Sequence, residues 1–179
     1  MRGGRGDWMQ TATGRQFWPM DPRPHEVSIE DIAHALSLLC RFGGHCLRFY
    51  SVAEHCVLLA RAAPAQFKLW ALLHDASEAY IVDVPRPLKP FLVNYAQAEA
   101  AVMRAIEFRF GLHLGMPDQV KKLDRAILVD EMRQNMAPAP AAWTSLEGVE
   151  PLGVVLQFWT PRQARIEFLR EFRNIKRAA

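Results

Sequence analysis

The sequence predicts an all-α protein, a helical bundle with about six main helices. Apolar residues recur at helical spacing in several segments, and capping or helix-breaking residues bound each segment. No run of alternating apolar and polar residues is long enough for a set of sheet-forming strands. The 179 residues have room for one ordinary domain, and the hydrophobic share of 50% excludes disorder for the bulk of the chain.

The first helix is expected only after an irregular lead-in over residues 1–27, which contains four glycines and three prolines. We therefore divide the chain into this lead-in and a single helical domain over 28–179. Ser28 resembles the start of a capping box, and so does Ser51 in front of the second helix. The boundary signals predict helices over about 28–42, 51–61, from 64 to before 82, and over 90–110, 117–136 and 161–179. Residues 141–159 fit either a short strand or a packed loop.

The charge and the cysteines restrict the class of protein further. The net charge of +3 is too small to indicate a nucleic-acid binder, although residues 161–179 hold six basic residues and two acids. Such a helix either contacts phosphate or presents a solvated face, and we favour the solvated face. Three cysteines without a CxxC motif, no apolar h-region at the N-terminus and no apolar stretch of roughly 18 residues predict a cytoplasmic protein with reduced thiols.

Three short segments carry the residues that suit a metal site: SVAEH over 51–55, LLHDASE over 72–78 and KLDRA over 122–126. Imidazole and carboxylate groups suit divalent Mn, Fe, Co, Ni or Zn. His74 and Asp75 are adjacent, so further ligands must come from neighbouring helices, and His55 and Asp124 can supply them. Glu78 lies one turn after His74 on the same face, where it can accept a proton from a bound water. The alternative for His74 alone is a core histidine, but a buried Asp75 without a partner would cost several kcal/mol.

These segments resemble the HD-domain metal-dependent phosphohydrolases, whose signature has the order H…HD…D. The run HDASEAYIVDVPRPLKPF is similar to a segment of the bacterial 5′-deoxynucleotidases. The stretch SIEDIAHALSLLCRFGGHCLRFYSVAEH is similar to a phage and bacterial subgroup of small HD hydrolases that includes deoxynucleoside triphosphate hydrolases. The resemblance covers roughly residues 11–135 and, more faintly, WTPRQARIEFL near the end.

The resemblance implies a set of site residues. The implied ligands of a divalent ion (Co, Mn, Fe, Ni, Zn or Mg) are His55, His74, Asp75 and Asp124. Glu78 matches the catalytic carboxylate, Asp83 and the loop to Arg86 match a substrate-contacting segment, and Arg41 lies within one residue of a phosphate-orienting arginine. Phe42 stands where the deoxynucleotidases have a tryptophan beside the sugar. From their positions alone, His45 and Lys89 are further candidates for substrate contact, and we expect Asp130 and Glu131 on a solvated face.

The expected function is therefore that of an enzyme, a nucleotide phosphohydrolase similar to the 5′-deoxynucleotidases. One alternative is a deoxynucleoside triphosphate triphosphohydrolase. Others are a metal-binding regulatory module without turnover and a nucleic-acid-binding protein that uses the C-terminal arginines. The expected partner is a small nucleotide rather than a membrane or a nucleic acid, and the resemblance implies a homodimer.

Overall fold

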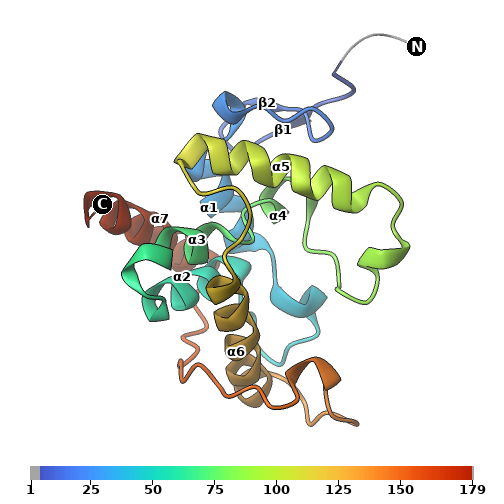
Figure 1. The fold of residues 1–179 in the computed structure, drawn as a ribbon, viewed down its shortest axis with the longest axis vertical. Coiled ribbons are helices and arrows are strands. Elements are labelled where there is room, and N and C mark those ends of the chain that lie inside the picture. Colours follow the sequence, from blue (N-terminus) through green and yellow to red (C-terminus); the bar gives the residue numbers. More distant parts are fainter. Residues whose placement is uncertain (1–4, 179) are drawn as a thin grey trace.

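The computed structural model describes residues 5–178, and its helices confirm the all-α class (Figure 1). The first four residues of the predicted lead-in lie outside this range. The helices are α1 (Ile29–Leu38), α2 (Val52–Ala62), α3 (Lys68–Leu73), α4 (Glu78–Ile81), α5 (Tyr95–Phe110), α6 (Asp118–Asn135) and α7 (Pro161–Ala178). The short 3-10 turns are Pro24–Glu26, Arg41–Gly44, Ala65–Phe67, Lys89–Phe91 and Thr144–Leu146.

Helix α2 is the centre of the bundle, and every residue from 51 to 60 is buried. Helices α1, α3, α6 and α7 pack against it, while α5 crosses over α4 and the turn at Pro24–Glu26 (Figure 1). A helix that is buried all round is normally apolar all round. The exceptions in α2 are Glu54 and His55, both 0% exposed, so each needs a specific polar partner.

The third predicted helix is divided in two. Residues 65–67 form a 3-10 turn, α3 ends at Leu73, and the single turn α4 begins only at Glu78. The hydrogen bonds across the break tighten to three-residue spacing, from the Ala76 amide to the Leu73 carbonyl and from the Glu78 amide to the Asp75 carbonyl. His74 and Asp75 therefore lie at a break between two helices rather than inside one.

The lead-in is mostly irregular but contributes to the core. It contains the strands β1 (Met9–Gln10) and β2 (Gln16–Phe17), which pair antiparallel. Phe17 is 0% exposed and stacks on Tyr80 with the ring centroids 3.9 Å apart. The lead-in is therefore part of the folded unit.

The segment between α6 and α7 is a packed loop with one 3-10 turn, the second of the two alternatives that the sequence left open. Leu156 is buried, and the carboxylate of Glu54 accepts hydrogen bonds from the backbone amides of Gln157, Phe158 and Trp159. The six basic residues of α7 are all exposed, while Ala164 and Phe168 are buried against the bundle. The exposure of these six side chains agrees with both alternatives for this helix, a solvated face and contact with phosphate. Among residues 5–178, no helix has both the length and the apolar character needed to cross a membrane.

Candidate metal centre

Four predicted ligands converge at the centre of the molecule. The Nε2 atoms of His55 and His74 lie 3.2 Å apart. The Asp75 carboxylate approaches these two atoms to 3.7 and 3.2 Å, and the Asp124 carboxylate approaches them to 3.3 and 3.7 Å. The potential ligand atoms of His55, His74 and Asp75 all lie within 4.8 Å of one another. Helix α2, the break after α3, and α6 thus each supply part of one cluster.

The hydrogen bonds of the two imidazoles show that this cluster fits a cation. The Nδ1 atom of His55 lies 2.6 Å from a Glu131 carboxylate oxygen, and that of His74 lies 2.8 Å from the Ala71 carbonyl oxygen. A carboxylate and a carbonyl only accept hydrogen bonds, so each Nδ1 donates, and each neutral ring presents an Nε2 lone pair to the other. Two facing lone pairs repel each other unless positive charge lies between them, and either a proton on one Nε2 or a divalent ion in its place would provide that charge.

The charges around the imidazoles also favour positive charge between the two rings. Burial opposes a charged His74, but the carboxylate of Asp75 raises the pKa of His74 well above its ordinary value. Burial also disfavours the charged form of Asp75, yet His74 and His55 lower the pKa of Asp75 to about 2. The carboxylate is therefore ionised at neutral pH. The cluster is built to hold positive charge at the point where the four side chains meet.

Glu131 corrects one expectation from the sequence. It was expected on a solvated face, but it is 0% exposed and bonds to both His55 and Arg41, with 3.0 Å between its carboxylate and the Arg41 guanidinium. Asp130 was expected on the same face and is also buried. Its carboxylate accepts hydrogen bonds from the amides of Gly153 and Val154, which compensate for the loss of water. A sequence signal for Glu131 exists, since it follows Asp124 by seven residues, which is two turns along the same face.

Arg41 lies beside the cluster, as the resemblance implies. Its side chain is largely buried, and its guanidinium lies 3.8 Å from the Asp75 carboxylate in addition to its bond with Glu131. Burial alone would lower the pKa of Arg41, but the carboxylates of Glu131, Asp75 and Asp124 raise it, so the group stays charged. Its buried Nε has no hydrogen-bond partner among the described residues.

Glu78 also faces this region. It is 7% exposed, and its Oε2 atom has no hydrogen-bond partner within residues 5–178. Burial, with the charges of Asp75 and Asp83, raises the pKa of Glu78 to about 9. Asp83 is half-buried and acts on the site through this charge. Glu78 therefore has the properties of a group that exchanges a proton.

The other predicted substrate residues differ in burial and in their contacts. Phe42 is half-buried, with the Arg41 guanidinium 5.3 Å from its ring centre and Trp143 edge-on to it at 6.2 Å. Lys89 pairs with Glu99 at 2.7 Å. His45 and Arg86 are exposed, and neither makes a side-chain hydrogen bond or ion pair among the described residues. The sequence reasoning missed Trp143, because it lies in the loop whose structure was left open.

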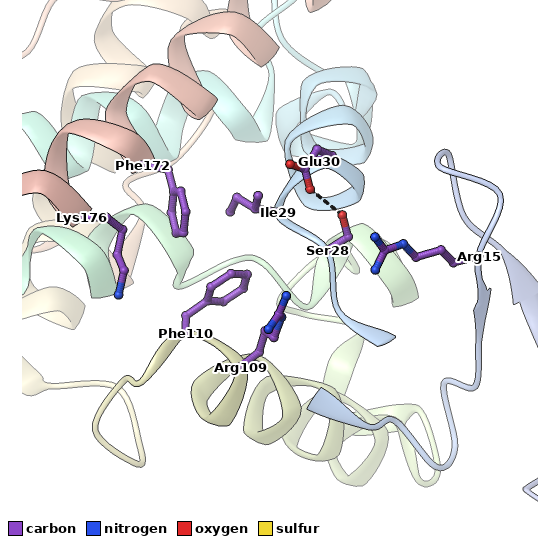
Figure 2. A pocket seen from close by; sticks show the side chains of 8 residues that line it. All are labelled: Arg15, Ser28, Ile29, Glu30, Arg109, Phe110, Phe172 and Lys176. Carbon is purple, nitrogen blue, oxygen red and sulfur yellow. Dashed lines mark hydrogen bonds between the residues drawn. The ribbon is translucent and has the colours of Figure 1, made fainter. Parts of the chain in front are cut away.

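A separate cleft lies on another part of the molecule, between the start of α1 and the ends of α5 and α7 (Figure 2). It has a volume of about 330 Å³. Its lining includes the cations Arg15, Arg109 and Lys176 and one carboxylate, that of Glu30, which accepts a hydrogen bond from Ser28. The residues that line the cleft do not include any member of the metal cluster.

The fold and this cluster define an all-α protein whose His/Asp centre has two buried imidazoles and two half-buried carboxylates. Comparison with known proteins shows its relatives. The chain is 38% identical over 142 residues to the uncharacterized protein YfdR of Escherichia coli (strain K12), a match that covers 79% of this chain and 80% of YfdR. It is 36% identical over 129 residues to an uncharacterized protein of Rhodobacter capsulatus, covering 66% of each chain. The chain belongs to the same family as YfdR. No family model matches it.

Proposed function

We propose that the protein is a metal-dependent phosphohydrolase of the HD-domain type that releases phosphate from nucleotides, with 5′-deoxynucleotides as the preferred substrates. The observation that carries this proposal is the pair of facing imidazole Nε2 atoms, 3.2 Å apart, with a carboxylate on each side. His55, His74, Asp75 and Asp124 would hold the ion. A divalent ion bound there supplies Lewis acidity toward a phosphoryl oxygen and lowers the pKa of a water.

The surrounding residues match the needs of phosphoryl transfer. Arg41 keeps a permanent positive charge, and within residues 5–178 its Nε has no hydrogen-bond partner, so it can neutralise charge that builds up on the phosphoryl oxygens. Glu78 can take the proton of the attacking water through its Oε2 atom, which has no hydrogen-bond partner in the described part of the chain. The positive charge of an ion would lower the pKa of Glu78 from about 9 toward the range that a general base needs.

The test is a phosphate-release assay with purified protein and a panel of nucleoside mono- and triphosphates, in both ribo and deoxy forms. Each reaction is run with Mn²⁺, Co²⁺, Mg²⁺ or Zn²⁺ and again with a chelator. We expect release of inorganic phosphate from deoxynucleoside monophosphates, dependent on the metal. Release of triphosphate from deoxynucleoside triphosphates alone would instead favour the triphosphohydrolase alternative. A lack of turnover with every substrate would favour a regulatory metal module.

One variant and a matched control separate chemistry from metal binding. Glu78→Gln should keep the metal and lower turnover by a factor on the order of 10²–10⁴, the usual contribution of an acid–base group. Glu107→Gln is the control, because Glu107 on α5 is also a buried glutamate but accepts its hydrogen bond from the amide of Gly115, which follows that helix. Loss of metal in Glu78→Gln would make Glu78 a ligand and contradict the role assigned to it.

A further inference from the structure

Two cysteine thiols flank the loop that carries Arg41. The Sγ atoms of Cys40 and Cys46 lie 3.5 Å apart and share a hydrogen bond. Both residues are half-buried free thiols, so each residue is partly accessible to solvent. A disulfide needs a separation of about 2.05 Å, so the sulfur atoms must approach each other by roughly 1.5 Å, which is within the reach of side-chain rotation.

The backbone around the loop holds the thiols in this position. On one side, the Arg41 amide donates to the Tyr50 carbonyl and the Val52 amide to the Leu39 carbonyl. On the other side, the amides of residues 47 and 48 donate to the backbone and side-chain oxygens of Asn135 on α6. The ends of the loop are therefore fixed to the bundle, and the thiols face each other across residues 41–45.

The loop itself has a tight backbone. Phe42, Gly43 and Gly44 have φ values of 56°, 58° and 83°, all in the left-handed region. A phenylalanine there is disfavoured, so the surrounding contacts must hold it in place. A covalent link between Cys40 and Cys46 would act directly on this conformation, because it would join the two ends of the strained segment.

We propose that Cys40 and Cys46 form a modification site, a dithiol that hydrogen peroxide oxidises to an intramolecular disulfide. The thiolate of one cysteine attacks a peroxide oxygen, the O–O bond breaks, and hydroxide leaves with a sulfenic acid remaining on the sulfur. The second thiol then attacks that sulfur, the S–S bond forms, and water leaves. Two thiols and one peroxide thus give one disulfide and two waters, and two electrons pass from sulfur to peroxide oxygen.

The third cysteine serves as an internal reference. Cys56 is fully buried in α2, and burial raises the pKa of its thiol to about 11. It therefore carries almost no thiolate at neutral pH. Burial and the hydrogen bond with Cys40 also raise the pKa of Cys46, so the rate of disulfide formation should increase as the pH rises.

The disulfide can be mapped without reference to any enzymatic activity. Trypsin cuts after Arg15, Arg41, Arg48 and Arg61, so the three cysteines fall in the separate peptides 16–41, 42–48 and 49–61. After treatment with peroxide, an acid quench and alkylation, we expect peptides 16–41 and 42–48 to be joined and lighter by two hydrogens, with 49–61 alkylated. The number of free thiols should fall from three to one, and dithiothreitol should restore it.

The variant Cys46→Ser provides the matched control, because it keeps Cys40 but removes the partner. It should form no intramolecular link under the same treatment. A link that involves Cys56, a link between two chains, or oxidation of Cys40 to sulfinic acid with no link in the wild-type protein would each overturn the proposal. So would three thiols that persist in peroxide while a reference dithiol protein is oxidised.

The effect on catalysis rests on the proposed function and is measured separately. Because Arg41 follows Cys40 directly, formation of the disulfide should displace the Arg41 guanidinium from Glu131 and Asp75. A displacement of about 1 Å can cost roughly 10²-fold in rate, so we expect kcat/KM to fall by about 10- to 100-fold in oxidised wild-type protein and to recover on reduction. Cys46→Ser should keep the same kcat/KM with and without peroxide. A mapped disulfide in a protein that hydrolyses no nucleotide would overturn the proposed function and leave the modification site intact.

Discussion

Glu131 connects three parts of the candidate metal centre through one carboxylate. It accepts a hydrogen bond from His55 at 2.6 Å and pairs with Arg41 at 3.0 Å, and it lies two turns after Asp124 on α6. Burial opposes its ionised form, but Arg41 and His55 hold the pKa of Glu131 below its ordinary value. The carboxylate therefore stays charged, fixes the His55 tautomer and aims Nε2 at the site.

This arrangement predicts that Glu131→Ala weakens metal binding even though Glu131 is not a ligand. Removing such a supporting group typically costs 10- to 100-fold in metal affinity, and we expect a loss of that size for Mn²⁺ in a calorimetric titration. Asp130→Asn is the matched control, since Asp130 is the neighbouring buried acid but bonds to the backbone at Gly153. Equal losses in the two variants would show that the effect is general destabilisation of α6.

Phe42 gives a prediction about sugar preference that rests on the proposed function. An apolar ring beside C2′ offers no partner to a 2′-hydroxyl, and an unsatisfied hydroxyl costs roughly 1–3 kcal/mol. That cost corresponds to about 5- to 150-fold preference for deoxyribonucleotides at 1.4 kcal/mol per decade. We expect this preference in kcat/KM for wild-type protein and a smaller one in Phe42→Ala. The same ratio in both proteins would mean that Phe42 only packs against Trp143.

At the scale of elements, the helices whose ends carry strong local signals were predicted closely. The helix predicted over 51–61 is observed as α2 (Val52–Ala62), and the helix predicted over 117–136 is observed as α6 (Asp118–Asn135). The hydroxyl of Ser51 accepts a hydrogen bond from the Glu54 amide, as the side chain of an N-terminal capping residue should. Helix α5 begins at Tyr95 instead of 90, because Asn94 has a φ of 66° and cannot continue a right-handed helix.

The break after α3 could not be predicted from local signals. Residues 68–81 contain no glycine or proline that would end a helix. In the structure, His74 lies at the break with its imidazole beside His55 on α2 and Asp124 on α6. The resemblance supplied the four candidate ligands, and the structure brings their side chains together. Their supporting residues could not be predicted, because Glu131 and Asp130 are charged side chains that a single sequence assigns to solvent.

The lead-in provides a prediction about pH at this scale. Arg5 bonds to both carboxylate oxygens of Glu26, at 2.5 and 2.8 Å, and to Asp21 at 2.6 Å. Burial alone would raise the pKa of Glu26, but the Arg5 contacts hold it below its ordinary value. The Arg5–Glu26 contact thus stabilises the folded state fully above the ordinary glutamate pKa of about 4.3. This stabilisation is lost as the pH falls through the lower pKa that Glu26 has in the folded protein.

Arg5→Gln should therefore lower the urea midpoint of unfolding at pH 7, and the difference from wild type should shrink between pH 4 and pH 3. Arg23→Gln is the control, because Arg23 is exposed and its guanidinium pairs with Asp21 at the longer distance of 3.4 Å. A difference between Arg5→Gln and wild type that stays constant down to pH 3 would mean that Arg5 acts by packing against Trp18, whose ring centre lies 4.1 Å from its guanidinium carbon.

At the scale of the whole molecule, the candidate metal centre joins segments that are far apart in the sequence. His55 comes from the central helix, His74 and Asp75 from the break after α3, and Asp124 from α6, which runs along one side of the bundle (Figure 1). Among described residues, α6 has few close contacts with α2 compared with those of α3 or α7. An ion at the cluster would therefore connect α6 to the rest of the bundle.

Metal binding should accordingly stabilise the fold, since an ion that binds only the folded state shifts the unfolding equilibrium. At 100 times the dissociation constant the gain is about 2.7 kcal/mol. For a protein of this size that gain raises Tm by roughly 5–11 °C, at about 2–4 °C per kcal/mol. Chelation should reverse the shift in wild-type protein, and Asp124→Ala should lack it, whereas Asp130→Asn should keep it even if its starting Tm is lower. Full metal content and a full Tm shift in Asp124→Ala would remove Asp124 from the ligand set and leave His55, His74 and Asp75 as the protein ligands.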